Sequence, residues 1–119
     1  MASEILERVL EDIKSYQDKR EIVNASFFER LLVRKISPER MHPNPEDEFS
    51  HADVGPSLSI IESYCSKIRF NQLHDFPIYE EPIIVKKMKD GDYMLLNGHH
   101  RWAAALKLKV KKVRALIVN

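Results

Sequence analysis

The side chains best suited to chemistry lie in one short stretch of this sequence, residues 97–101. They read Asn-Gly-His-His-Arg, between an apolar run typical of a buried strand and an alanine-rich segment typical of a helix. We expect Asn97 to be the N-cap and Gly98 the first helical residue, where the missing Cβ lets a ligand approach the backbone. Free N–H groups and the positive end of the helix dipole meet at such a junction. The stretch therefore predicts a phosphate site.

Three side chains of the predicted first turn strengthen this interpretation. Arg101 carries a planar fork of donors that matches phosphate oxygens. His99 and His100 can donate as well, and a bound phosphate would favour their charged forms. Ordinary helix capping, with two adjacent histidines and one arginine by chance, explains the same residues. The residues alone leave both interpretations open.

The composition limits the class of protein. At 119 residues the chain is of single-domain size and can bury enough surface to fold without a disulfide or a metal. Its 19 Lys and Arg nearly balance its 18 Asp and Glu, which argues against the uniform positive field of a dedicated nucleic-acid binder. The lone Cys65 is expected to be a buried, unreactive thiol. No signal peptide or membrane-spanning run is found, so we expect a soluble cytoplasmic protein.

Hydrophobic spacing and turn residues predict the elements that position the junction. They are, in order, a helix over 3–20 capped by Ser3, a short helix opened by Asn24, a strand at 33–36, one helical turn at 37–40, a loop at 42–45, a helix capped by Ser57 or Ser59, strands at 82–87 and 93–96 joined by a hairpin turn at Asp90 and Gly91, a helix over 98–108 and a strand over 111–118. The apolar face of the first helix consists of Ile5, Leu6, Val9, Leu10, Ile13 and Tyr16. Trp102 is expected in the core, and the basic residues from Lys107 to Arg114 on a solvated face.

The order of these segments resembles the ParB/sulfiredoxin superfamily. The resemblance rests on the proline loop at 43–45, the Pro-Ile-Ile-Val strand at 82–85, the Gly-His-His-Arg helix start at 98–101 and the closing strand at 113–118. It divides the chain into an N-terminal helical extension, residues 1–32, and a ParB/sulfiredoxin-like domain, residues 33–119. It implies a small α+β fold, a mixed β-sheet with flanking helices, and a nucleotide or phosphate site at that helix N-terminus.

Two branches of the superfamily fit this sequence poorly. Sulfiredoxins, which resemble this chain at residues 98–101, have Gly-Cys-His-Arg there, and the cysteine is their catalytic residue. In this sequence His99 stands at the position of that cysteine. Chromosome-partitioning ParB proteins have Gly-Glu-Arg-Arg, bind CTP and add a helix-turn-helix domain, which we do not expect in this chain. Sulfinic-acid reduction and DNA segregation are therefore not the expected activities.

A third branch, the ADP-dependent free-serine kinases, resembles this chain at Gly-His-His-Arg and uses acidic residues for its chemistry. The resemblance makes the acidic run at 46–48 a candidate for a general base or a Mg²⁺ ligand. Glu48 is the first choice and Asp47 the second, and a solvated acidic loop is the alternative. A ParB-like nuclease is less favoured, because phosphodiester cleavage generally needs clustered carboxylates with two metals.

Two functions from different classes remain open at this point. The first is a small-molecule kinase or nucleotide hydrolase that uses ATP, ADP or CTP, with Mg²⁺ as a further expected cofactor. In it the stretch 97–101 holds the phosphates, and Glu48, Asp47 and His99 carry the chemistry. The second is a non-catalytic module that responds to a nucleotide or associates with DNA, in which the first helix mediates a partner contact or a homodimer. We favour a nucleotide-binding domain, and nucleic acid has little support.

Overall fold

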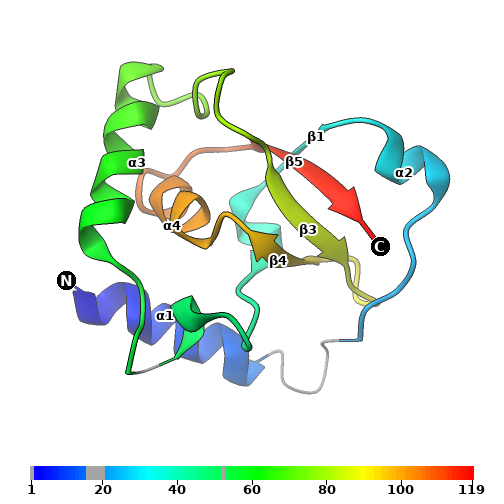
Figure 1. The fold of residues 1–119 in the computed structure, drawn as a ribbon, viewed down its shortest axis with the longest axis horizontal. Helices are drawn as coiled ribbons and strands as arrows, with labels where there is room; N and C mark the ends of the chain where they lie inside the picture. The colour runs from blue at the N-terminus through cyan, green and yellow to red at the C-terminus, as the bar shows by residue number, and fades with distance from the viewer. Residues whose placement is uncertain (1, 16–20, 52) are drawn as a thin grey trace.

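The computed structural model describes residues 2–15, 21–51 and 53–119, without the side chains of residues 2–6 and 13. Its centre is a five-stranded mixed sheet in the order β1-β5-β3-β4-β2. The strands are β1 (Arg34–Ile36), β2 (Met41–His42), β3 (Ile83–Lys87), β4 (Tyr93–Asn97) and β5 (Val113–Val118). β5 is antiparallel to β1 and parallel to β3, and β2 is parallel to β4 (Figure 1). The expected α+β fold is confirmed.

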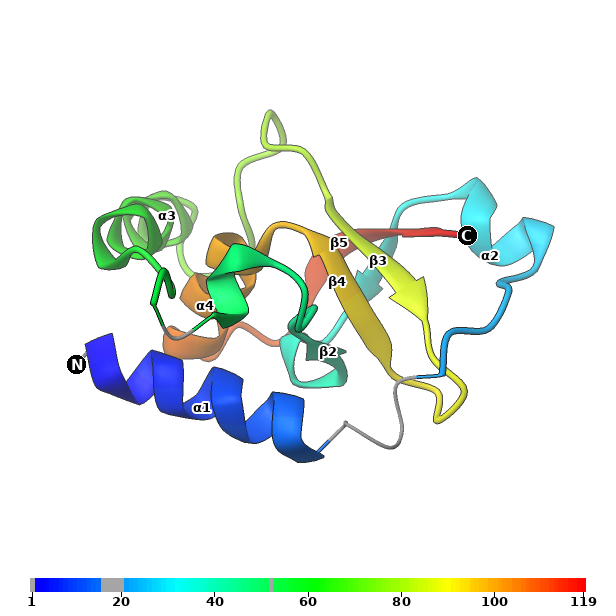
Figure 2. The same cartoon turned by 60° about the horizontal axis from the view of Figure 1, so that its bottom comes forward.

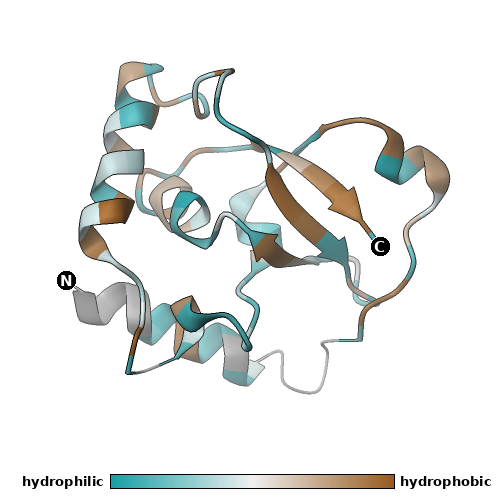
Figure 3. Cartoon of the chain, in the orientation of Figure 1, coloured by the Kyte–Doolittle hydropathy of each residue, from teal (hydrophilic) through white to brown (hydrophobic). Residues whose placement is uncertain are grey.

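The strands bury alternate residues, as the period of two in their sequences predicts. Val85, Leu95 and Val113 are fully buried, whereas Lys86, Met94 and Leu96 point to the opposite, partly exposed face. Figure 3 shows the apolar residues that run along β3 and β5. The hairpin between β3 and β4 turns at Asp90 and Gly91, as predicted.

One strand was not predicted. His42 was assigned to a proline-rich loop, but Met41 and His42 pair in parallel with Tyr93 and Met94 of β4. The pairing stops before Pro43 because proline has no N–H to continue the ladder. A two-residue strand has too few residues to show a period, which is why the sequence pattern did not reveal it.

Four α-helices and two 3₁₀ turns surround the sheet in the described part of the chain. They are α1 (Ala2–Ser15), α2 (Phe27–Leu31), η1 (Pro38–Arg40), η2 (Glu48–Ser50), α3 (Leu58–Phe70) and α4 (His99–Lys107). Ser57 caps α3 and Ser37 caps η1, both as predicted. Asn24 does not open the second helix: Ser26 does, because it forms a reciprocal capping box with Glu29.

The helix α1 packs against η2 and β2 (Figure 2). Val9 is fully buried and Leu10 is 42% exposed. The other residues of its predicted apolar face (Ile5, Leu6, Ile13 and Tyr16) and its predicted continuation over 16–20 lie outside the described residues or side chains. Val9 and Ala25 belong to the same buried cluster as the residues of the sheet. The division of the chain into a helical extension, residues 1–32, and a domain, residues 33–119, stays a prediction.

The core lies between the sheet and the pair α3 and α4, which pack against each other. Trp102 is 1% exposed, and its indole N–H donates to the Pro38 carbonyl at 2.9 Å, so its predicted place in the core is confirmed. Cys65 is fully buried as expected, and this burial raises the pKa of its thiol. None of the described helices is long and apolar enough to cross a membrane.

Candidate functional site

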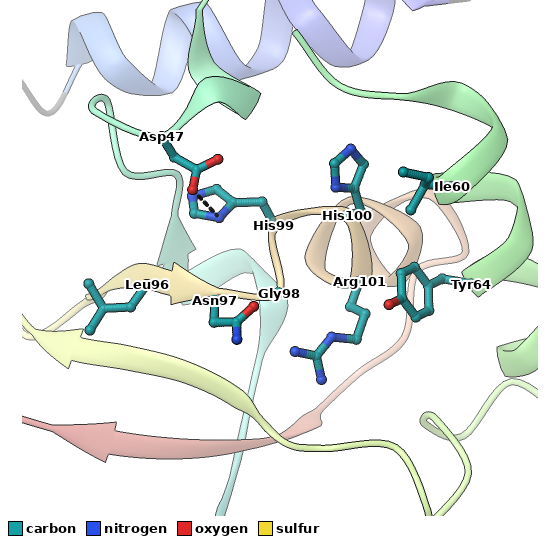
Figure 4. Close-up of a pocket in the computed structure, with 9 residues that line it drawn as sticks. All are labelled: Asp47, Ile60, Tyr64, Leu96, Asn97, Gly98, His99, His100 and Arg101. Atoms are coloured by element: carbon teal, nitrogen blue, oxygen red, sulfur yellow. Dashed lines mark ion pairs between the residues drawn. The ribbon is translucent and has the colours of Figure 1, made fainter. Parts of the chain in front are cut away.

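A pocket of about 340 Å³ opens at the N-terminus of α4, between that helix, the end of β4 and the first turns of α3 (Figure 4). Its lining residues are Asp47, Ile60, Tyr64, Leu96, Asn97, Gly98, His99, His100 and Arg101. All five residues of the predicted phosphate stretch thus line one pocket. These five residues lie together at the pocket because the chain passes from β4 to α4 without an intervening loop.

The junction differs by one residue from the prediction. Asn97 is the last residue of β4, and Gly98 is the N-cap of α4, with φ 102° and no side-chain capping bond. The first intrahelical bond runs from the Trp102 N–H to the Gly98 carbonyl at 2.8 Å. The N–H groups of His99, His100 and Arg101 precede it and have no acceptor within the helix. They supply the partial positive charge that an anion would meet at this pocket.

Gly98 is required for two reasons. Its φ lies in the left-handed region, which residues with a Cβ rarely adopt. A Cβ at this position would also lie 3.0 Å from Nη2 of Arg101 and 3.1 Å from Cγ1 of Ile83. The guanidinium of Arg101 therefore occupies the space that the glycine leaves.

Arg101 is held by the fold. The residue is 6% exposed, and its Nη1 donates to the Glu81 carbonyl, just before β3. In Figure 4 its guanidinium points away from the two histidines, on the side of Asn97. It lines the pocket as a preorganised donor, because part of its rotamer freedom is already lost.

The two histidines fix neighbouring segments to the start of α4. Nε2 of His99 accepts from the Asn44 N–H, and Nε2 of His100 accepts from the Ser57 N–H, both at 3.0 Å. The Phe49 ring packs on both imidazoles, with ring centroids at 5.3 and 5.1 Å. The histidines thereby link the acidic loop and the first turn of α3 to α4.

These hydrogen bonds also define the protonation of the imidazoles. Burial lowers the pKa of His99 to about 4, against an opposing effect of the Asp47 charge, and burial lowers the pKa of His100 as well. Both rings are therefore neutral near pH 7. Because each Nε2 accepts, the proton is assigned to each Nδ1, and Nδ1 of His99 lies 3.8 Å from Oδ2 of Asp47. Their charged, phosphate-donating forms stay a prediction for a bound anion.

The structure distinguishes the two acidic candidates. Asp47 lines the pocket with its side chain 40% exposed, and its Oδ1 accepts from the Phe49 N–H to cap η2. Glu48, the first choice from the sequence, is exposed and does not line this pocket. Tyr64 and Ile60 also line it, although the sequence gave Tyr64 only as part of a helical apolar pattern. In the part of the chain that is described, no three His, Cys, Asp or Glu residues gather in a group that could hold a metal.

Sequence comparison finds one family model and one curated relative that match part of this chain. Residues 67–119 match the model of the ParB N-terminal domain. The ATP-dependent L-serine kinase of Staphylothermus marinus is 36% identical over 69 residues, which are 58% of this chain and 25% of the kinase. The chain thus spans a quarter of the length of this curated relative.

Two solved structures have the same fold. A free serine kinase in complex with AMP aligns with a TM-score of 0.54 and 22% identity, over 73% of this chain and 31% of the kinase chain. Sulfiredoxin from Arabidopsis thaliana aligns with a TM-score of 0.54 and 19% identity, over 74% of this chain and 85% of the sulfiredoxin chain. At these identities the likeness extends to the fold alone.

Proposed function

We propose that this chain carries a domain of the ParB/sulfiredoxin superfamily, since residues 67–119 match the ParB N-terminal domain and the fold is shared with sulfiredoxin, and that the pocket at the N-terminus of α4 binds the phosphates of an adenine nucleotide. The observation that carries the proposal is the pocket itself, into which the first turn of α4 brings its N–H groups and the guanidinium of Arg101. Gly98 keeps the backbone accessible there. ATP and ADP are the first candidates, since the curated relative is named as ATP-dependent, and CTP is the alternative from the sequence.

We further propose that the domain takes part in phosphoryl transfer to a small hydroxyl acceptor, for which serine is the first candidate from the names of its relatives. The acceptor oxygen would form a bond to the terminal phosphorus, the bond from that phosphorus to the nucleotide oxygen would break, and the acceptor proton would pass to a carboxylate. Asp47 is the carboxylate at this pocket, which makes it the better general base of the two acidic candidates. His99 would act as a positioning residue through Asp47.

A Mg²⁺ ion fits this pocket only as a partner of the nucleotide. Magnesium is commonly bound through one or two carboxylates together with substrate phosphates. Asp47 is the one carboxylate in the lining, so it would supply the protein ligand. The ion would neutralise charge on the phosphates when bound.

Nucleotide binding is tested first, by thermal unfolding and calorimetry with ATP, ADP, AMP, CTP and inorganic phosphate. A ligand that binds only the folded chain raises the unfolding temperature. Arg101→Lys keeps the charge but loses the fork, so we expect it to weaken nucleotide binding about tenfold. Arg69→Lys, at an exposed position on α3, is the matched control. Equal affinity in Arg101→Lys and the parent chain, or no binding of any of these compounds, would refute the proposal.

Phosphoryl transfer is tested with the nucleotide that binds and with L-serine, by following nucleotide turnover and phosphoserine. We expect Asp47→Asn to lower the turnover number on the order of 10²-fold to 10⁴-fold, with the affinity for nucleotide without Mg²⁺ largely kept. Glu48→Gln separates the two carboxylates: if only this variant is inactive, the assignment to Asp47 is wrong. Binding without turnover in the parent chain would instead indicate a nucleotide-responsive module.

A nucleic-acid partner finds no specific support in the basic run that begins at Lys107. Lys107 is paired with Glu62 at 3.1 Å, and Arg114 donates to the carbonyls of Pro77 and Glu80. Lys107 and Arg114 are therefore already engaged in contacts within the domain. Salt-dependent affinity for duplex DNA in the physiological range would contradict this interpretation.

A further inference from the structure

A second cavity, of about 440 Å³, lies next to the phosphate pocket. Its apolar lining consists of Ile22, Pro45, Met94 and Leu96, and its polar groups are Asn44, Glu46 and Lys86. Leu96 borders both cavities. The alternation of β3 and β4 places Lys86 and Met94 on the outward face of the sheet, opposite the buried core.

The two charged side chains that line this cavity do not form an ion pair with each other. Glu46 and Lys86 line the same space, yet neither forms an ion pair with any residue in the described ranges 2–15, 21–51 and 53–119. The neighbouring lysines behave differently: Lys87 is paired with Glu29, and Lys89 with Glu21. An anion and a cation that face one cavity without contact leave room for a ligand with complementary charges between them.

We propose that this second cavity binds a small zwitterion of the amino-acid class, with its ammonium at Glu46 and its anionic group at Lys86. The four apolar residues would cover the aliphatic part of the ligand. The inference rests on the proposed function for the acceptor, since this cavity would give phosphoryl transfer a place for an amino acid such as serine. Binding of the zwitterion itself does not depend on the nucleotide.

One loop connects the two cavities. Asn44 and Glu46 line the second cavity, and Asp47, the next residue, lines the phosphate pocket. The loop is anchored at both sides, because the Asn44 N–H donates to His99 and the Asn44 carbonyl accepts from the Ser50 hydroxyl at 2.7 Å. A ligand at Glu46 therefore lies one residue from the carboxylate of the first pocket.

The binding test uses ligands that differ by one charged group. L-alanine, L-lactate and ethylamine are titrated into the ¹⁵N-labelled chain, and the amide shifts of Asn44, Glu46, Lys86 and Met94 are followed. We expect saturable shifts with L-alanine and at least tenfold weaker binding of the two compounds that lack one charge. L-leucine should bind more tightly than L-alanine, because it buries more apolar surface on Met94 and Leu96.

Two variants test the assignment of the charges. Lys86→Met keeps the aliphatic stem, and Glu46→Gln keeps the shape, so both should fold and both should weaken L-alanine about tenfold. Lys112→Met and Glu11→Gln, at exposed positions elsewhere, are the matched controls. ADP affinity in all four should stay within about twofold of the parent, which separates this site from the phosphate pocket.

Three results would overturn the inference. They are no saturable shift with any amino acid, equal binding of L-alanine and L-lactate, and unchanged binding in both Lys86→Met and Glu46→Gln. Each would do so even if ADP binds, and the proposed function would then stand without this second site. Conversely, a zwitterion site that persists when ADP does not bind would support the inference and remove the nucleotide proposal.

Discussion

At the scale of single residues, the site depends on Gly98, against which the side chain of Arg101 packs. Gly98 turns the chain from β4 into α4 with a positive φ, and Nη2 of Arg101 lies 3.0 Å from the position that a Cβ would take. One residue thus controls the backbone conformation, the position of the guanidinium and the access of a ligand to the first N–H groups of the helix. Gly91, in the hairpin turn, also has a positive φ, but nothing lies within 4 Å of the position of its Cβ.

The pair of glycines allows backbone strain to be separated from crowding. We expect Gly91→Ala to cost about 1 kcal/mol of unfolding free energy, because only the left-handed conformation is penalised. Gly98→Ala should cost roughly 2–4 kcal/mol, because crowding against Arg101 and Ile83 is added to the same penalty. Urea unfolding measures both values, and nucleotide titration should show a loss of affinity only for Gly98→Ala. Equal costs for the two variants would contradict the crowding argument.

At the scale of elements, a buried histidine joins α1 to the sheet. His42 of β2 lies 2.9 Å from Asp92 through Nε2, and its Nδ1 lies 3.6 Å from Asp12 of α1. Burial lowers the pKa of His42, but hydrogen bonds and charges of Asp12 and Asp92 together outweigh it and raise the pKa above 6.5. Since α1 also packs on η2, which Asp47 caps, the docking of this helix is connected to the phosphate pocket.

The docking of α1 should weaken as the pH rises. A histidine with a raised pKa in the folded chain stabilises it fully below pH 6.5, and this contribution is lost as the pH rises through the raised pKa. His99 and His100 act in the opposite direction, because their lowered pKa values cost stability as the pH falls below 6.5, and for His99 this loss continues down to about pH 4. We therefore expect the unfolding temperature to pass through a maximum near pH 6.5, where the two ranges meet.

His42→Gln should remove the decline on the alkaline side and leave the acid side unchanged. The measurement is the unfolding temperature from pH 5 to 9, together with hydrogen exchange of the α1 amides. His74→Gln, at an exposed position in the loop after α3, is the control. An alkaline decline that persists in His42→Gln would show that another group causes it.

At the scale of the whole molecule, the last strand lies near the middle of the sheet. β5 pairs with β1 on one side and with β3 on the other. It thereby joins two strands, β1 and β3, that are about fifty residues apart in the sequence. Its buried residues (Val113, Ala115 and Ile117) are part of the central core. The carboxyl-terminal residue also contributes, since the Asn119 side chain accepts from the Ala25 N–H at 2.8 Å.

Removal of residues 113–119 should prevent the domain from folding, because β1 loses its partner strand, β3 loses one of its two partners, and the core loses Val113, Ala115 and Ile117. Amide dispersion in NMR spectra and far-ultraviolet circular dichroism would detect this loss. Asn119→Ala, which removes one hydrogen bond at the end of the strand, should cost only about 1 kcal/mol. A truncated chain with native dispersion would show that the remaining strands can form a sheet by themselves.

What the sequence determined by itself is local. The strand, the absence of a loop, the glycine and the helix of residues 93–107 follow from composition and spacing, because the interactions that specify them span only a few residues. Even there the N-cap was misplaced by one residue, since the left-handed conformation of Gly98 ends the strand at Asn97.

Only the tertiary structure decided what surrounds that junction. It brings Asp47 rather than Glu48 to the pocket: Asp47 caps the 3₁₀ turn η2 and lines the pocket, whereas Glu48, the first residue of that turn, is exposed. It adds Tyr64 from α3, and it makes both histidines neutral acceptors for the Asn44 and Ser57 amides, which are 55 and 43 residues away. Contacts over such separations depend on the packing of whole elements, and a local sequence pattern does not encode that packing.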